Sequence, residues 1–468
     1  MSKSSFVSIE GDRLTVDGKP ILLKGAGLGG WMNMENFITG YPGHEYQMRK
    51  EMKKVLGEEK YEYFFDKFLE YFFTEDDAKL FSELGLNCLR LPINYRHFED
   101  DMNPRVFKPE GLKHLDRVIN LCAKYKIYTV IDLHAAPGGQ NIDWHADAGN
   151  NQANFWLHKD FQDRAVVLWE HLAKHYKDNT WVAGYNPLNE PTDESHTALL
   201  AFYERIEKAI RAIDQNHILF LDGNTFGSDF RRFGEPLPRS VYACHDYSNY
   251  GFPGAPEAFT GTPDQHAYHQ RILGQKIEYM KKHKLPIWNG EFGPVYANPA
   301  DGPDWEKTNE SRYGVLKYQL SLYKEQNISW SIWLWKDIGY QGMVYVKPDA
   351  PYMKLLAPFL QKKKDLAIDE WGCDDAPVRD LFDPIYKWMF KAAPWLEKRY
   401  PSAWKGVKHI NRVLRECLLS EELCVEYASY FKDKSMEELD QLAHSFALSS
   451  CDQREKLNKI LGDDTKTA

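Results

Sequence analysis

The sequence predicts an α/β protein, a (β/α)8 TIM barrel with an N-terminal β-hairpin and a C-terminal helical extension. From Leu22 onward, eight short apolar strands follow one another and are mostly separated by amphipathic helices, as expected of a closed parallel barrel. Polar, chemically capable residues stand at the carboxyl ends of these strands, where such barrels carry their sites. Two doubly wound domains would fit the strand count but not this placement. We assign residues 1–393 to the barrel with its hairpin and residues 394–468 to the extension.

The hairpin is predicted over residues 6–24, with a turn through Asp17-Gly18. The glycine-rich residues 24–31 lack the Gly-Lys-Ser/Thr ending of a phosphate loop and any dinucleotide-binding pattern. They predict close backbone approach at the mouth of a barrel. The long aromatic connection over residues 32–73 is typical of a lid or a pocket wall.

Helices and strands then alternate. Helices are predicted at 75–84, 111–125, 160–176, 196–213, 264–283 and 311–326, and a closing helix at 378–390. The corresponding strands are 87–93, 128–134, 181–185, 218–222, 241–247, one around Ile287, and 328–335. The strand at 241–247 has no clear helix before it.

The tail has a different pattern. Short amphipathic helices are predicted at 408–419, 421–431 and 435–448, the last beginning with a capping box of Ser435 and Glu438. The tail carries no set of catalytic or metal-binding residues of its own, so we interpret it as a structural extension. A surface for a protein partner is the alternative, and the sequence identifies no such partner.

Composition limits the possible functions. A net charge of −9 disfavours a nucleic-acid partner. The first residues lack the apolar core of a secretory signal, and no apolar stretch is long enough to form a transmembrane segment. Seven cysteines form an odd set without metal-ligand spacing, which is typical of reduced thiols in an intracellular protein. We expect a cytoplasmic protein that uses neither a metal nor an organic cofactor.

Two glutamates end two different strands. Glu190 stands in Asn189-Glu190-Pro191, and Glu291 stands in Gly290-Glu291-Phe292-Gly293. A glycosidic oxygen is a poor leaving group and needs a proton from a carboxylic acid of raised pKa. The anomeric carbon needs a carboxylate on its other face, about 5–5.5 Å from the acid if configuration is retained. The pair therefore predicts glycoside cleavage.

Further strand-end residues support this chemistry, although each alone could be an ordinary structural residue. Arg90 and the Tyr247 hydroxyl are suited to keep a nucleophile ionised. Asn189 is suited to bind the sugar 2-hydroxyl, and His245 to orient the acid. His134 completes the strand-end set.

Tryptophan is abundant, with 14 residues, and its ring is a good platform for sugars. Trp333 is the candidate floor of the sugar subsite. Trp335 lies on the same face of the predicted strand and is the alternative.

At these residues the chain resembles glycoside hydrolase family 5, a family of retaining (β/α)8-barrel enzymes. The resemblance runs from Leu14 to about Phe390 and implies that Glu190 is the proton donor and Glu291 the nucleophile. It also implies active-site roles for Arg90, His134, Asn189, His245, Tyr247 and Trp333.

Within the family the chain is most similar to the fungal exo-β-glucanase and β-glucosidase branch. Residues 28–31, with Glu35 and residues 37–39, resemble the first loop of that branch, which implies that Glu35 contacts the terminal glucose. Residues 136–141 resemble its third loop, whereas residues 142–145 and the tail depart from it.

We therefore predict a retaining β-glycosidase that acts exo on a β-glucoside or glucan. An endo-β-glucanase with an open cleft is the first alternative, and an intracellular glycolipid β-glucosidase acting on steryl or ceramide glucosides is the second. A carbohydrate-binding barrel without catalysis is the non-enzyme alternative, which the presence of both glutamates disfavours.

Overall fold

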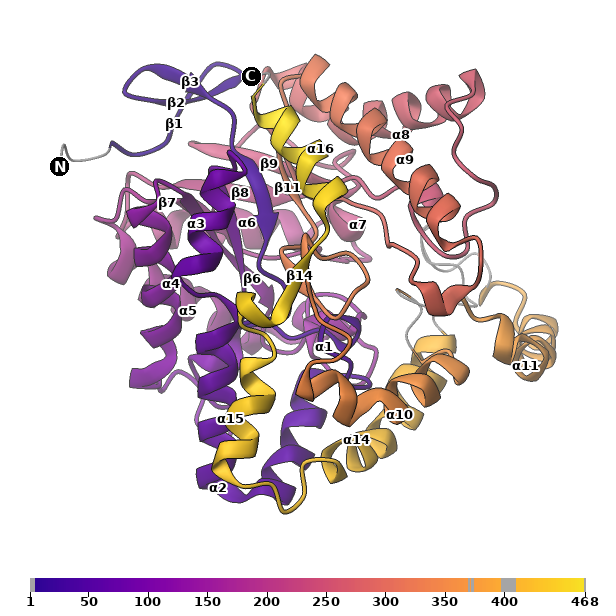
Figure 1. The fold of residues 1–468 in the computed structure, drawn as a ribbon. Helices are drawn as coiled ribbons and strands as arrows, with labels where there is room; N and C mark the ends of the chain where they lie inside the picture. The colour runs from indigo at the N-terminus through magenta and orange to yellow at the C-terminus, as the bar shows by residue number, and fades with distance from the viewer. Residues whose placement is uncertain (1–4, 369–370, 372–373, 397–409, 467–468) are drawn as a thin grey trace.

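The computed structural model describes residues 5–368, 371, 374–396 and 410–466 (Figure 1). Its centre is a closed barrel of eight parallel strands that neighbour one another in chain order. The strands are β4 (Lys24–Gly27), β5 (Cys88–Asn94), β6 (Tyr128–Ala135), β7 (Val182–Asn186), β8 (Ile218–Asp222), β9 (Ser240–His245), β10 (Ile287–Glu291) and β11 (Ser329–Ile332). The predicted (β/α)8 barrel is confirmed.

Helices surround the barrel: α1 (Asn36–Thr39), α2 (Glu45–Phe72), α3 (Glu75–Glu83), α4 (Lys113–Lys124), α5 (Lys159–Tyr176), α6 (Ala198–Arg211), α8 (Pro263–His283) and α9 (Trp305–Glu325). Helix α4 shows why they pack there, because Leu115, Val118, Ile119 and Cys122 form one buried stripe at helical spacing. Only the short α7 (Asn224–Gly227) separates β8 from β9, as the sequence indicated. None of the described helices combines the length and apolar character needed to cross a bilayer.

The N-terminal segment forms the predicted hairpin together with one further strand, so that three antiparallel strands make a small sheet. They are β1 (Ser8–Glu10), β2 (Arg13–Val16) and β3 (Lys19–Ile21). Val7 and Leu14 pack into one apolar cluster with barrel residues, among them Val130 and Trp288. This sheet therefore belongs to the packing of the barrel.

The first barrel strand is itself part of the glycine-rich stretch. A Cβ on Gly25 would lie 1.6 Å from the carbonyl oxygen of Cys88, so only glycine allows β4 and β5 to approach this closely. The expectation of close backbone approach is confirmed. The approach occurs within β4 as well as at the mouth of the barrel.

The chain returns to the barrel after β11. Strands β12 (Lys336–Asp337), β13 (Val344–Val346) and β14 (Cys451–Gln453) form a second small sheet, which joins the C-terminal segment to the loop after β11. Helix α10 (Pro351–Asp365) follows β13, whereas α11 (Arg379–Ala392), the predicted closing helix, lies at the periphery (Figure 1).

The C-terminal helices pack on the barrel's own helices. A π-helix at Arg412–Leu419 leads into α14 (Ser420–Ser429), and α14 and α15 (Met436–His444) both contact α2. The last helix is α16 (Glu455–Thr465), and its Asp464 accepts a hydrogen bond of 2.8 Å from the buried Lys24 of β4. The predicted helix start at Lys408 lies outside the described residues.

Candidate active site

Most of the predicted site residues meet at one end of the barrel. Arg90 lies on β5, and His134, His245 and Glu291 lie at the carboxyl ends of β6, β9 and β10. The others come from the segments that follow β4, β7, β9 and β11. A cavity of about 2280 Å³ opens above them. The predicted residues that line it are Glu35, His134, Glu190, His245, Tyr247, Glu291 and Trp333. Arg90 and Asn189 are fully buried beneath these side chains.

Glu291 is bound by a cation and a phenol. Arg90 Nη1 donates to its Oε1 at 2.6 Å, and the Tyr247 hydroxyl donates to its Oε2 at 2.9 Å. Burial alone would raise the pKa of Glu291, but the neighbouring His245 and the Arg90 guanidinium outweigh it and lower the pKa below its usual value. Glu291 is therefore ionised at neutral pH.

Glu190 has the opposite environment. Burial, and next the charge of Glu291, raise its pKa well above the usual value. Its Oε1 lies 2.6 Å from His245 Nδ1. The nearest carboxylate oxygens of the two glutamates lie within 4.8 Å of each other, and a His245 nitrogen lies within the same distance. The site thus holds two neighbouring carboxyl groups whose pKa values are shifted in opposite directions.

Glu190 adopts a strained backbone conformation. Its φ of +46° lies in the left-handed region, which costs a non-glycine residue about 1–3 kcal/mol. The Glu190 N–H donates to Asp222 Oδ2, and the Glu190 carbonyl accepts from Asn141 Nδ2, both at 2.9 Å. These two bonds, from the loop after β6 and from the end of β8, hold the conformation.

Arg90 also anchors the amide beside the acid. Its Nη2 donates to Asn189 Oδ1 at 2.6 Å and lies 3.1 Å from Asp132 Oδ2. Asn189 Nδ2 in turn lies 3.4 Å from His134 Nε2. One guanidinium therefore connects the Glu291 carboxylate to the Asn189 amide.

A third buried glutamate, Glu35, also lines the cavity. Trp144 Nε1 donates to its Oε2 at 3.2 Å, and His134 Nε2 lies 3.5 Å from its Oε1. Burial alone would lower the pKa of His134, but the Asp132 carboxylate raises it to about 10. His134 is therefore cationic, and its ring stacks on Trp333 at 5.3 Å and 5°.

The position of Trp333 explains two further glycines of this stretch, Gly27 and Gly29. A Cβ on Gly27 would lie 2.7 Å from the Trp333 ring, and one on Gly29 would lie 2.5 Å from it. The absence of a side chain at these two glycines thus leaves room for the Trp333 indole ring at the mouth of the barrel.

Trp335 is not part of the site, so this prediction was wrong. Its indole N–H donates to Asp77 Oδ1 at 2.9 Å, and its ring packs on Phe81, away from the cavity. The prediction assumed an unbroken strand to residue 335, but β11 ends at Ile332. The alternation of side chains therefore does not extend to Trp335.

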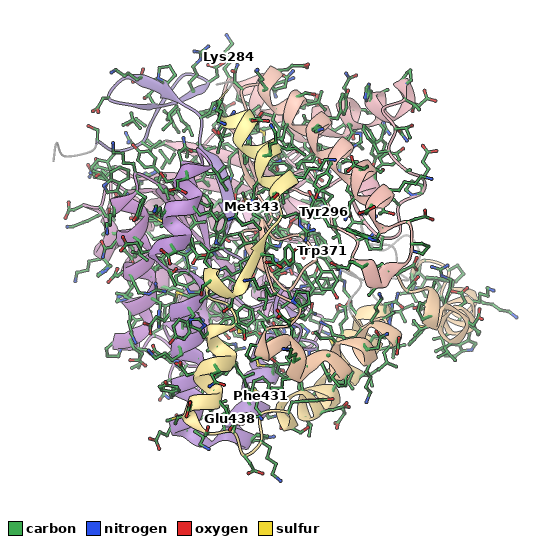
Figure 2. All side chains as sticks on the ribbon, in the orientation of Figure 1. Lys284, Tyr296, Met343, Trp371, Phe431 and Glu438 are labelled. Atoms are coloured by element: carbon green, nitrogen blue, oxygen red, sulfur yellow. The ribbon has the colours of Figure 1, made fainter. Side chains whose placement is uncertain are left out.

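Sequence reasoning missed several residues. Asp132 and Asp222 are buried carboxylates inside apolar strands, and a charge in such a run was the available signal. Trp371 and Arg412 come from beyond the barrel strands, and no local pattern indicated them. Trp371, labelled in Figure 2, packs edge-to-face on Tyr247 at 5.0 Å.

Arg412 brings the C-terminal segment into the cavity wall. Its guanidinium lies 4.6 Å from the centre of the Trp144 ring and bonds the Asp143 carboxylate. The cavity is therefore lined partly by residues that lie beyond the barrel's last helices.

A parallel barrel with two neighbouring carboxyls of oppositely shifted pKa at its carboxyl-terminal rim is the arrangement of a glycoside hydrolase. The family model described as Cellulase (glycosyl hydrolase family 5) matches residues 52–339, and the chain belongs to glycosyl hydrolase family 5. It is a glycoside hydrolase acting on β-glycans.

Named relatives cover different parts of the chain. The protein named Beta-xylosidase from Phanerodontia chrysosporium is 56% identical over 467 residues, 98% of each chain. Probable glucan 1,3-beta-glucosidase A from Emericella nidulans is 30% identical over 68% of this chain and 86% of that protein. Endoglucanase C from Acetivibrio thermocellus is 25% identical over 65% of this chain and 95% of that protein.

One solved structure, titled as an endogalactoceramidase, has a TM-score of 0.51 at 18% identity. The match covers 71% of this chain and 75% of that one. This likeness concerns the fold alone.

Proposed function

We propose that the protein is a retaining, exo-acting β-glucosidase in which Glu190 is the acid–base and Glu291 the nucleophile. The observation that carries the proposal is the separation of less than 4.8 Å between the two glutamates' nearest oxygens, combined with their opposite protonation. Retaining enzymes place the two carboxyl groups about 5–5.5 Å apart, whereas inverting enzymes leave roughly 6.5–9.5 Å for a water.

In the first step, Glu190 donates its proton to the glycosidic oxygen as the bond from that oxygen to the anomeric carbon breaks. A Glu291 oxygen bonds to the same carbon, and the alcohol leaves. In the second step, Glu190 takes a proton from water, the water oxygen bonds to the carbon, and the Glu291 ester breaks. Both glutamates return to their starting protonation states.

The surrounding groups are placed to bind the sugar. Trp333 lines the cavity beside the His134 ring on which it stacks, and Glu35 presents a buried carboxylate to hydroxyl groups. The Asn189 amide, fixed by Arg90, is placed to bond the 2-hydroxyl. A bond to that hydroxyl strengthens in the transition state.

The cavity wall supports exo action. Trp144 bonds Glu35 and is covered by Arg412, and Trp371 packs on Tyr247, so residues from the C-terminal part of the chain stand beside the sugar-binding groups. Trp371 and Arg412 lie beyond residues 52–339, the part that matches the family model. An endo-acting enzyme needs a cleft that is open at this side.

The identity of the sugar has a second candidate. The relative that is 56% identical is named Beta-xylosidase, which favours β-xylosides as substrates. A panel of nitrophenyl α- and β-glycosides of glucose, xylose, galactose and mannose separates the candidates, together with a polymeric β-glucan. Glucoside turnover with a β-configured first product supports the proposal. An inverted first product, or random internal cleavage of the glucan, contradicts it.

A further inference from the structure

Arg412 joins the C-terminal segment to the wall of the cavity. It begins the π-helix Arg412–Leu419, is 5% exposed, and is one of the residues that line the cavity. Its Nη1 bonds the Asp143 carboxylate and also donates to Glu416 Oε2 at 3.1 Å. Two carboxylates therefore fix the guanidinium in the wall.

The guanidinium holds Trp144 in two ways. Its carbon lies 4.6 Å from the centre of the Trp144 ring, which is a cation–π contact between two buried groups. Asp143 Oδ1, the oxygen that bonds Arg412, also accepts from the Trp144 N–H at 2.9 Å. Arg412 thus contacts the ring directly and is connected to the backbone of Trp144 through Asp143.

Trp144 in turn fixes Glu35. The indole N–H donates to Glu35 Oε2 at 3.2 Å. Glu35 Oε1 lies 3.5 Å from His134 Nε2 and is buried without a hydrogen-bond partner within the described part of the chain. A buried carboxylate oxygen without a donor is costly unless a ligand supplies one. This oxygen is therefore available to a sugar hydroxyl, and the bond from Trp144 helps to set its direction.

We infer that Arg412 is a positioning residue for sugar recognition, which acts through Trp144 on Glu35. A carboxylate that is held in place bonds a hydroxyl of one configuration and leaves the epimer without that bond, whereas a mobile carboxylate follows either sugar. Arg412 supplies part of this rigidity from outside the barrel. The C-terminal segment, interpreted from the sequence as structural, thereby takes part in the choice of sugar. The inference rests on the proposed function, which makes the cavity a sugar subsite.

The test measures sugar discrimination in variants that remove the guanidinium. Arg412→Met and Arg412→Gln both do so, so the test does not depend on the folding of one of them. The readout is the ratio of kcat/KM between the nitrophenyl glycoside of the sugar that the wild type prefers and that of its C4 epimer. We expect the ratio to fall by about three- to tenfold, because the carboxylate is still present but less well held. The loss is partial because Trp371 still packs on Trp144.

Two further variants locate the effect. Trp144→Phe keeps a ring beside Arg412 but removes the N–H that bonds Glu35, and it should lower the ratio as the Arg412 variants do. In the Glu35→Ala background, Arg412→Met should change the ratio by less than about twofold, because both substitutions act through the same carboxylate.

Arg415→Met is the matched control from the same helix. Arg415 is also buried, and its guanidinium lies 5.2 Å from the centre of the Phe382 ring, outside the cavity lining. We expect Arg415→Met to lower Tm and to leave the ratio unchanged.

Three outcomes overturn the inference: an unchanged ratio in the folded Arg412 variants, an additive loss in the double variant, or an equal loss in Arg415→Met. A wild type that gives an inverted first product contradicts the retaining mechanism but leaves the comparison of sugars intact. The failure of the proposed function and the failure of this inference are therefore distinguishable.

Discussion

Replacing Glu190 by alanine separates acid catalysis from a structural role. The substitution removes the proton donor but none of the bonds to Glu291, which come from Arg90 and Tyr247. The nucleophile therefore stays in place and ionised. General acid catalysis is worth about 10²–10⁴-fold, so we expect a loss of that size on methyl β-glucoside. With dinitrophenyl β-glucoside, formation of the covalent intermediate should change little.

The pH profile gives an independent reading of the same variant. In the wild type, the rate rises as Glu291 loses its proton, below the usual carboxyl pKa, and falls as Glu190 loses its proton, well above it. Glu190→Ala should lose the alkaline limb and keep the acid limb. If the alkaline limb persists in the variant, another titrating group causes it.

The assay is stopped-flow release of dinitrophenol followed by steady-state turnover. Because the same residue acts as the base toward water, turnover should stall after a burst, and azide should relieve the stall with a product of retained configuration. Glu204→Ala, at an exposed position on α6, is the control and should behave as wild type. Equal slowing of both substrates without a burst would refute the mechanism.

Three further outcomes are expected. Glu291→Ala should abolish turnover, and azide should restore it with a product of inverted configuration by NMR; wild-type activity would exclude the assignment. Glu35→Ala should weaken discrimination between glucosides and galactosides by about 1–3 kcal/mol in relative kcat/KM, and unchanged ratios would contradict its role. Trp335→Phe should lower the free energy of unfolding in urea by about 1–3 kcal/mol, through the lost bond to Asp77, while KM stays unchanged. Trp333→Phe should instead raise KM.

Much of the barrel could be predicted because each strand is short, apolar and buried, and each helix repeats its apolar residues at helical spacing. These are local properties of the chain. The carboxyl ends of parallel strands meet at one rim, so strand-end residues such as Arg90 and Glu291 could be placed together without knowing a distance. Local pattern plus barrel topology therefore predicted most of the site.

What could not be predicted depends on where a pattern stops or on contacts between distant segments. The end of β11 at Ile332 removed Trp335 from the sugar-binding face, and nothing in the alternating sequence marks that end. Strand β1 pairs with β2 although only the hairpin has a recognisable turn signal. Trp371 and Arg412 line the cavity because segments that are distant in the sequence pack together there. The spacing of residues within one segment does not indicate such contacts.

The different tasks proposed for the two glutamates also follow from such distant contacts. Both are buried, and burial alone raises the pKa of either one. Within the described part of the chain, the guanidinium that bonds the pair is that of Arg90, which directs Nη1 to Glu291 and Nη2 to Asn189. Glu291 thereby keeps its negative charge, and that charge holds the proton on Glu190. Together with His245, Arg90 on β5 thus produces the difference in pKa between the two glutamates on which the proposed mechanism depends.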